Sequence, residues 1–175
     1  KNHIRSHTAT AIGLNNIVTA LHAIAFNEGN KVLGYASLGL GDHNGLYGRY
    51  NFSGGWNNKS FGAVNFNYGS TNYLKGENLV GFGSTNHVEG LYDIVQGFKN
   101  NIDGNYNSVN GYGNKVDGNN NTINGLSNIV NSSFNEVFGT ENSIVATSDS
   151  NIVNGNKNKI TKEKCAAKAN KGKVN

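Results

Sequence analysis

The sequence predicts an all-β solenoid with a 14-residue coil, in which each coil contains two copies of a short motif and two short strands. Three observations lead to this prediction. A seven-residue motif repeats without a break from Asn2 to Ser148. Apolar residues alternate with other residues inside each motif, which is the period of a strand and not of a helix. The chain of 175 residues contains no proline, the residue that cannot donate a hydrogen bond to a neighbouring strand.

The motif is a five-residue word followed by two variable residues. Of 21 copies, 16 begin with Asn, 16 have an apolar residue at the third position, and 16 have Gly at the fifth. Clear examples are NSVNG, NKVDG and NTING, which begin at residues 107, 114 and 121. After Ser148 two additional residues intervene, and the motif resumes at Asn151. Repetition at a fixed period is the sequence signature of repeat architectures such as solenoids.

A seven-residue period also suggests a coiled coil, but the residue types exclude one. A coiled coil needs two apolar positions in every heptad, and this motif has one. Gly in a helix interior costs about 1 kcal/mol relative to Ala, so the 16 glycines of the motif would cost about 16 kcal/mol. The repeat therefore favours strands.

We expect one strand over each five-residue word, beginning with 2–6 and 9–13 and recurring in every motif, with a turn after each strand. Side chains at the first, third and fifth positions should face the interior, and those at the second and fourth should face outward. Gly at the fifth position can take the positive φ that tight turns need. Asn side chains of successive coils can form a ladder of amide hydrogen bonds.

Alternate strands differ in their outward residues. The strand that begins at residue 2 and every second strand after it carry many charged residues, whereas the strands between them carry mainly apolar ones. A continuous exposed apolar face marks an interaction surface, so we predict that copies of the chain associate through it. The predicted interface residues are Ile12, Ile24, Phe26, Leu38, Leu40, Phe52, Phe66, Tyr68, Val80, Phe82, Ile94 and Phe138.

The net charge of +4 arises from the end of the chain. Residues 157–175 contain seven lysines and one acid, which leaves 8 basic and 10 acidic residues in 1–156. A nucleic-acid groove would spread its positive charge over the folded body, so we expect no nucleic-acid partner. We expect residues 1–148 to form about ten coils and residues 149–175 to form a final irregular coil and a lysine-rich tail, which could be a neck, a cap or a disordered end.

No pattern of catalytic, cofactor-binding or metal-binding residues stands out. The five histidines have no Cys or acid at ligand spacing, and Asp does not recur as in calcium-binding repeats. No GxSxG motif or pair of catalytic carboxylates is evident. We therefore predict a protein that is not an enzyme and that needs no cofactor. Cys165 is expected to be a free thiol in the tail, with pairing between chains as the alternative.

Aromatic residues beside turns are the best candidates for contact with a receptor, because aromatic and Arg side chains dominate binding hot spots. Arg49, Tyr50 and Trp56 are predicted to cluster one coil edge apart, and Tyr92 and Phe98 are further candidates. The alternative is that these rings pack on neighbouring coils or across a subunit interface.

Words such as ATAIG, NSVNG, NKVDG and NTING, with two words in each coil over about residues 1–160, resemble the head repeats of the YadA-like trimeric autotransporter adhesins. The resemblance implies a left-handed parallel β-roll, assembled as a homotrimer. It also implies display at the outer membrane of a Gram-negative bacterium through a C-terminal anchor that lies outside this sequence. The implied role is adhesion to host cells, to extracellular-matrix proteins or to other bacteria.

A solenoid can also serve other functions. A trimeric phage or viral fibre with polysaccharide activity would need paired acids in a groove between chains, and a purely structural solenoid is a further alternative. An ice-binding solenoid would need a regular Thr ladder, but the threonines are scattered. The hexapeptide acyltransferases are excluded because their repeat has six residues and this one has seven.

Overall fold

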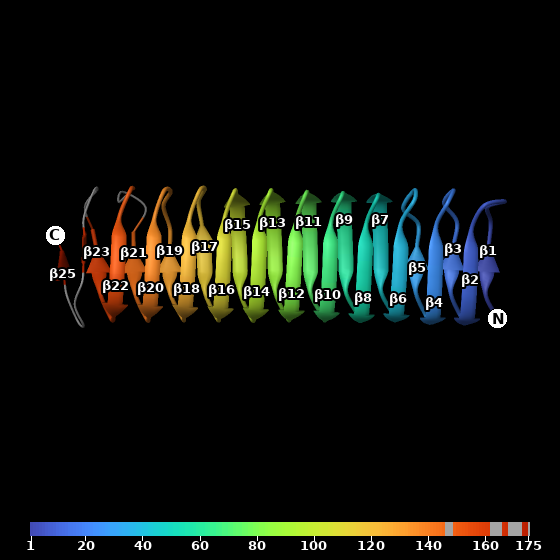
Figure 1. The fold of residues 1–175 in the computed structure, drawn as a ribbon, viewed down its shortest axis with the longest axis horizontal. Coiled ribbons are helices and arrows are strands. Elements are labelled where there is room, and N and C mark those ends of the chain that lie inside the picture. Colours follow the sequence, from blue (N-terminus) through green and yellow to red (C-terminus); the bar gives the residue numbers. More distant parts are fainter. Residues whose placement is uncertain (146–148, 162–165, 168–172, 175) are drawn as a thin grey trace. The chain divides into compact units, whose positions relative to one another are not determined.

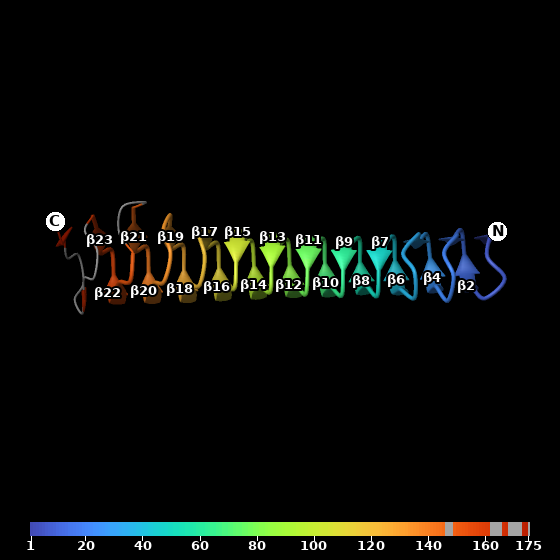
Figure 2. The same cartoon turned by 90° about the horizontal axis from the view of Figure 1, so that it is seen from above.

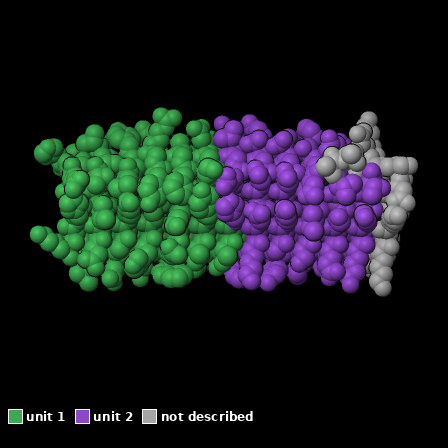
Figure 3. All heavy atoms as spheres, turned by 180° about the vertical axis from the view of Figure 1, so that it is seen from behind, with its two compact units in different colours: residues 1–86 green, residues 87–175 purple. Residues whose placement is uncertain are grey.

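The computed structural model describes residues 1–145, 149–161, 166–167 and 173–174. Over these residues the chain is an all-β parallel solenoid of about 11 turns with no helix, as the sequence predicted (Figure 1). It divides into two compact units, residues 1–86 (unit 1) and residues 87–175 (unit 2) (Figure 3). Each unit is described by itself below.

In unit 1 the strands form two parallel sheets, in which the strands of one sheet alternate along the chain with those of the other. Figure 2 shows the two sheets as separate layers. The odd sheet contains β1 (His3–Ile4), β3 (Ile17–Val18), β5 (Lys31–Val32), β7 (Gly45–Arg49), β9 (Lys59–Ala63) and β11 (Tyr73–Glu77). The even sheet contains β2 (Thr10–Leu14), β4 (Ile24–Glu28), β6 (Leu38–Asp42), β8 (Phe52–Trp56), β10 (Phe66–Ser70) and β12 (Val80–Ser84).

Unit 2 repeats this arrangement of two sheets. Its odd sheet contains β13 (His87–Leu91), β15 (Asn101–Asn105), β17 (Lys115–Asp117), β19 (Ile129–Val130), β21 (Ser143–Ile144), β23 (Lys159–Ile160) and β25 (Lys173–Val174). Its even sheet contains β14 (Ile94–Phe98), β16 (Ser108–Tyr112), β18 (Thr122–Leu126), β20 (Glu136–Thr140), β22 (Ile152–Asn156) and β24 (Ala166–Ala167).

Strand pairing confirms that each coil contains two motifs. Phe66 of β10 pairs with Phe52 on one side and with Val80 on the other, and these residues hold the same motif position one coil earlier and one coil later. Ser108 and Thr122 pair in the same way in unit 2. The two additional residues after Ser148 lengthen one coil, so that Ile144 pairs with Ile160. The insertion therefore does not change which motif positions pair.

The interior holds the first and third positions of the motif, as predicted, whereas the fifth position, also expected inside, is partly or fully exposed in most copies because it lies where the strand turns. In unit 2 the third positions form a row of fully buried aliphatic side chains that includes Val109, Ile123 and Val137. In unit 1 part of this row is polar: the hydroxyls of Ser53 and Ser60 lie 2.9 Å apart, and Asn67 donates to the Ser60 hydroxyl at 3.3 Å. Hydrophobic burial inside these coils is correspondingly small, and large aromatic residues lie outside them instead.

Buried asparagines at the first position form the predicted ladder. The side-chain oxygen of Asn100 accepts hydrogen bonds from the backbone N–H and the side-chain amide of Asn114, both at 3.0 Å. The same amide donates to the carbonyl of Gly125, also at 3.0 Å. Each amide thus satisfies backbone groups at the turn that would otherwise be buried without partners.

Two positions of most motifs have a positive φ at the turn, the fifth and the seventh. Gly111, at the fifth position of its motif, has a φ of 136°, and a Cβ added there would overlap the carbonyl oxygen of Gly125 in the next coil. The seventh position is also left-handed although it is seldom Gly: Tyr92 and Tyr106 have φ values of 59° and 57°. The backbone N–H of Tyr106 donates to the carbonyl of Leu91 at 2.9 Å, so this turn is tied to the preceding coil.

Candidate functional site

The outer face of the even sheet in unit 1 is apolar over all six strands. One row of in-register residues includes Ile24, Leu38, Phe52, Phe66 and Val80. The rings of Phe52 and Phe66 stack at 4.6 Å between centroids, and those of Phe66 and Phe82 lie 5.2 Å apart. We call this surface the apolar face. It is formed by Ile12, Ile24, Phe26, Leu38, Leu40, Phe52, Phe66, Tyr68, Val80 and Phe82.

The apolar face is accessible to solvent in the single chain. Ile12 is 56% exposed and Tyr68 is 54% exposed, while Phe66 and Phe82 are each more than a third exposed. Most of the remaining members are half-buried. A patch of this composition on a single chain is unusual for a protein that stays monomeric, because such patches generally mark contact surfaces.

The corresponding face of unit 2 is mainly polar in its described part. Ile94 and Phe138, the two remaining residues predicted at the interface, occupy outward positions of β14 and β20. The strands between them present Ser108, Asn110, Thr122 and Asn124. The twelve predicted interface residues therefore all lie on even sheets, but they form a continuous apolar surface only in unit 1.

The structure does not bring Trp56 together with Arg49 and Tyr50, contrary to the sequence prediction. Arg49 ends β7 and Tyr50 follows it, whereas Trp56 ends β8 and so lies at the far end of that strand. Tyr92 precedes β14 and Phe98 ends it, so these two residues are separated in the same way. The physical reason is that successive turns lie at opposite edges of the sheets, so only turns that are a whole coil apart become neighbours.

Several of these turn residues pack on neighbouring coils and remain exposed. The Tyr50 ring meets Tyr35 edge-on at 5.6 Å, Tyr92 stacks with Tyr106 at 5.0 Å, and Phe98 stacks with Tyr112 at 5.4 Å. Tyr50, Tyr92 and Trp56 are each more than half exposed. The alternative considered for the rings, packing between coils, therefore holds for three of the candidates.

In each unit, other exposed apolar residues lie at or just after the ends of odd strands, as Tyr50 and Tyr92 do. They are Leu21, Val64, Leu91 and Phe134, with exposed fractions from 40% to 60%. None of them was predicted: Leu21, Val64 and Leu91 are aliphatic and so fall outside the hot-spot argument, whereas Phe134 is an aromatic residue beside a turn that the same argument covers. The four residues are separated by multiples of 14 residues to within one residue, and this spacing could have placed them at equivalent turns.

The odd sheet of unit 1, whose strands were expected to carry many charged residues, also carries aromatic rings. Tyr47 stacks on Phe61 at 4.6 Å with an interplanar angle of 5°, and Phe61 lies 5.4 Å from Tyr73. The Lys31 ammonium lies 5.7 Å from the centre of the Tyr47 ring. Because the rings of Tyr47 and Phe61 stack face to face, they contact one another and stabilise adjacent coils.

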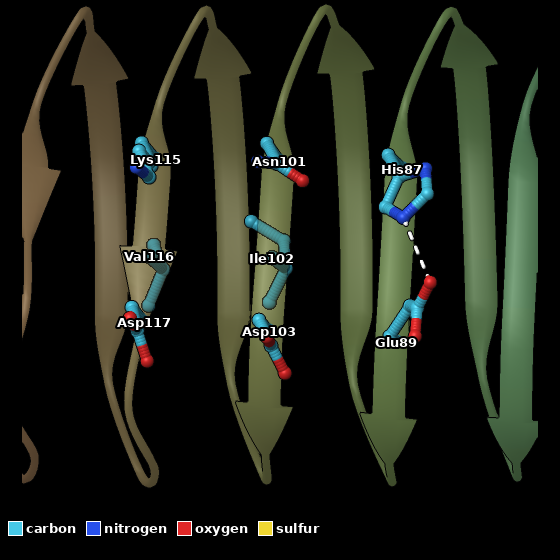
Figure 4. A pocket seen from close by; sticks show the side chains of 8 residues that line it. All are labelled: His87, Glu89, Asn101, Ile102, Asp103, Lys115, Val116 and Asp117. Atoms are coloured by element: carbon cyan, nitrogen blue, oxygen red, sulfur yellow. Dashed lines mark hydrogen bonds and ion pairs between the residues drawn. The ribbon is translucent and has the colours of Figure 1, made fainter.

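A cavity of about 350 Å³ opens on the outer face of the odd sheet in unit 2 (Figure 4). Three carboxylates from successive strands, Glu89, Asp103 and Asp117, lie in register along it. The Nε2 atom of His87 lies 3.1 Å from Oε1 of Glu89. The remaining lining residues are Asn101, Ile102, Lys115 and Val116. This surface is suited to polar or positively charged groups. Charged residues were expected on these strands, but their carboxylate row was not predicted as a site.

Among the described residues, no group of three or more His, Cys, Asp or Glu is arranged to hold a metal ion. The described part of the chain has no helix long and apolar enough to cross a membrane. Cys165 falls outside the described residues.

Comparison with known proteins adds no family to this description. No protein-family model matches the sequence, and the search of curated proteins finds no significant relative.

Proposed function

We propose that this chain is the head of a trimeric surface adhesin, which attaches a bacterium to host cells, to extracellular-matrix proteins or to other bacteria without catalysing a reaction. The observation that carries the proposal is the apolar face of unit 1, which six adjacent strands present to solvent. A face of this kind fits a head in which copies of the chain shield one another's apolar surfaces.

The resemblance of the repeats to YadA-like heads supports the finer points of the proposal. These are a left-handed roll, three chains around one axis, and display at the outer membrane through an anchor beyond this sequence. Cyclic assembly suits a chain with one apolar sheet face, because a closed ring lets every copy bury that face against another. Three copies would also present each binding edge three times, which raises avidity through weak individual contacts.

The residues proposed to contact a receptor lie at both edges of the sheets. Arg49, Tyr50 and Tyr92 belong to the edge at which odd strands end, and Trp56 and Phe98 belong to the edge at which even strands end. The proposal involves no nucleic acid and no cofactor.

Adhesion can be tested by binding the purified protein to immobilised matrix proteins, cultured host cells and bacteria. We expect saturable binding to one of these surfaces by a species with the mass of three chains. The Tyr50→Ala and Trp56→Ala variants then report separately on the two edges, and the variant at the contact edge should bind at least tenfold more weakly. A protein that binds none of the three surfaces, or that binds as a monomer, would contradict the proposal.

A trimeric phage or viral fibre that acts on polysaccharide is a second candidate, and the carboxylate row of β13, β15 and β17 is the observation that favours it. Adjacent strands are about 4.8 Å apart, close to the spacing of about 5 Å between the two carboxyls of retaining glycosidases. New reducing ends released from bound polysaccharide, and lost in the Asp103→Asn variant, would favour this candidate over the adhesin.

A further inference from the structure

One position of the buried amide ladder in unit 2 holds an acid. Asp93, in the turn between β13 and β14, is fully buried, and it begins the only one of the 21 motifs that starts with Asp. Its Oδ1 atom accepts hydrogen bonds from the backbone N–H of Asn107 at 2.7 Å and from the Asn107 side-chain amide at 3.0 Å. This half of the carboxyl therefore does what the amide oxygen of a ladder Asn does.

The other half of the side chain occupies the place of an amide donor. Three ladder asparagines of unit 2 each donate an N–H to the carbonyl 11 residues ahead: Asn107 to Gly118 at 2.8 Å, Asn114 to Gly125 at 3.0 Å, and Asn128 to Gly139 at 2.9 Å. The equivalent carbonyl for Asp93 belongs to Gly104. The Oδ2 atom of Asp93, however, has no hydrogen-bond partner.

Two oxygens therefore meet where the ladder normally has a donor and an acceptor. A Cβ built on Gly90 would contact both the carbonyl oxygen of Gly104 and Oδ2 of Asp93, so the two atoms border the same small space. An ionised carboxylate can only accept hydrogen bonds, whereas the protonated form carries an O–H that can donate. A proton on Oδ2 would restore the missing bond of the ladder.

We propose that in mild acid the native fold holds Asp93 in its protonated form, with Oδ2 donating to the Gly104 carbonyl, and that unit 2 is therefore more stable in mild acid than at neutral pH. Burial raises the pKa of Asp93 to about 6; the two hydrogen bonds from Asn107 oppose the shift, and the charge of Asp103 adds to it. Within unit 2, the neighbouring strand β13 carries His87 and Glu89, and β15 carries Asp103, all at outward positions. Strands β14 and β16 carry no charged residue.

The direction of the pH effect follows from this raised pKa. The unfolded chain releases the Asp93 proton near pH 3.8, whereas the folded chain keeps it until about pH 6. Between these values the folded state binds more protons, so the stabilisation is complete below about pH 3.8 and is lost as the pH rises through 6. A shift of about two pKa units corresponds to about a 100-fold change in the unfolding equilibrium.

The test compares urea unfolding of the protein with that of Asp93→Asn, which restores the amide, over pH 4 to 8. Between pH 4 and 7 we expect the unfolding equilibrium constant of the unaltered protein to rise about 50-fold more than that of Asp93→Asn, because the unfolded carboxyl is already partly ionised at pH 4. The matched control Asp103→Asn removes an exposed acid nearby and should retain most of the pH dependence. Parallel pH profiles for the unaltered protein and Asp93→Asn would overturn the proposal.

A second measurement needs no unfolding. The carboxyl carbon resonance of Asp93, identified by its absence in Asp93→Asn, should titrate with a midpoint near pH 6. A midpoint near the ordinary value of about 4 would overturn the proposal even if the variant were more stable for another reason.

Discussion

The residue that defines this fold is the buried asparagine at the start of most motifs. Asn114 shows why: its oxygen accepts from the backbone and side chain of Asn128 at 3.1 and 3.0 Å, while its amide donates to Asn100 and to the Gly125 carbonyl. No other short side chain offers two acceptor sites and two donors at once. Ser and Asp, which occur elsewhere in the ladder, each supply part of this set.

Replacing Asn114 by Ala should therefore destabilise unit 2 by about 3 to 5 kcal/mol, because buried groups of Asn100, Gly125 and Asn128 would each lose a partner. The comparison is Asn110→Ala, which alters an exposed residue of β16 and should change stability by less than about 0.5 kcal/mol. Chemical denaturation measures both variants. Similar losses in the two would mean that the ladder contributes little.

At the scale of the strand and its turn, the end of each strand is shaped by close contact between backbones of successive coils. The fifth residue must be Gly where a Cβ would enter the next carbonyl, as at Gly111. The seventh residue only needs a left-handed backbone, which Tyr, Thr, Ser and Asn adopt here at a cost of about 1 to 2 kcal/mol each. The motif that contains β16 has Gly at both positions, Gly111 at the fifth and Gly113 at the seventh, so the two requirements can be tested separately.

Gly111→Ala and Gly113→Ala form the corresponding pair of variants. Gly111 has a φ of 136° and no room for a methyl group, so we expect its substitution to cost more than about 3 kcal/mol. Gly113 has a φ of 63°, and the nearest atom to an added Cβ is the Ser127 hydroxyl at 3.6 Å, so Ala should cost about 1 kcal/mol. Thermal unfolding followed by circular dichroism distinguishes the two; equal losses would refute the packing argument.

For the molecule as a whole, the two units differ most in what their even sheets present to solvent. Unit 1 has the apolar face outside and several polar residues inside, including Ser53, Ser60 and Asn67. Unit 2 has an aliphatic interior and polar outward rows in its described part. Unit 1 therefore buries less apolar surface inside its coils and exposes more outside them.

The double variant Phe66→Lys with Phe82→Lys should convert the proposed trimer into monomers, because two charges would be buried without partners in the interface. Ile17→Lys is the control, since it places a charge at an exposed aliphatic position on the odd sheet of the same unit. Sedimentation equilibrium gives the mass of each protein. A double variant that remains assembled would show that the apolar face is not the interface.

The features that many copies of the motif share could be predicted from the sequence. The 14-residue coil, the inward Asn and aliphatic rows and the amide ladder all follow from local periodicity, because each copy of the motif reports the same geometry. The prediction was wrong for Arg49, Tyr50 and Trp56, whose proximity depends on which edge each turn occupies. The row of outward acids on β13, β15 and β17 was not predicted as a site, although its three members share one motif position. The consequence of an acid at Asp93 was not predicted, since it depends on a contact between coils at a single position.

The lengthened coil beyond β21 has a practical consequence. Asn135 and Asn151 are 16 residues apart, yet the backbone and side chain of Asn151 still donate to the Asn135 oxygen at 3.1 and 2.9 Å. Pairing between Ile144 and Ile160 is likewise retained. Extra chain between Ile144 and Asn151 is therefore accommodated while the coils on either side keep their partners. We expect a short peptide inserted in this coil to leave the flanking strands paired as well, so the coil could carry a displayed epitope.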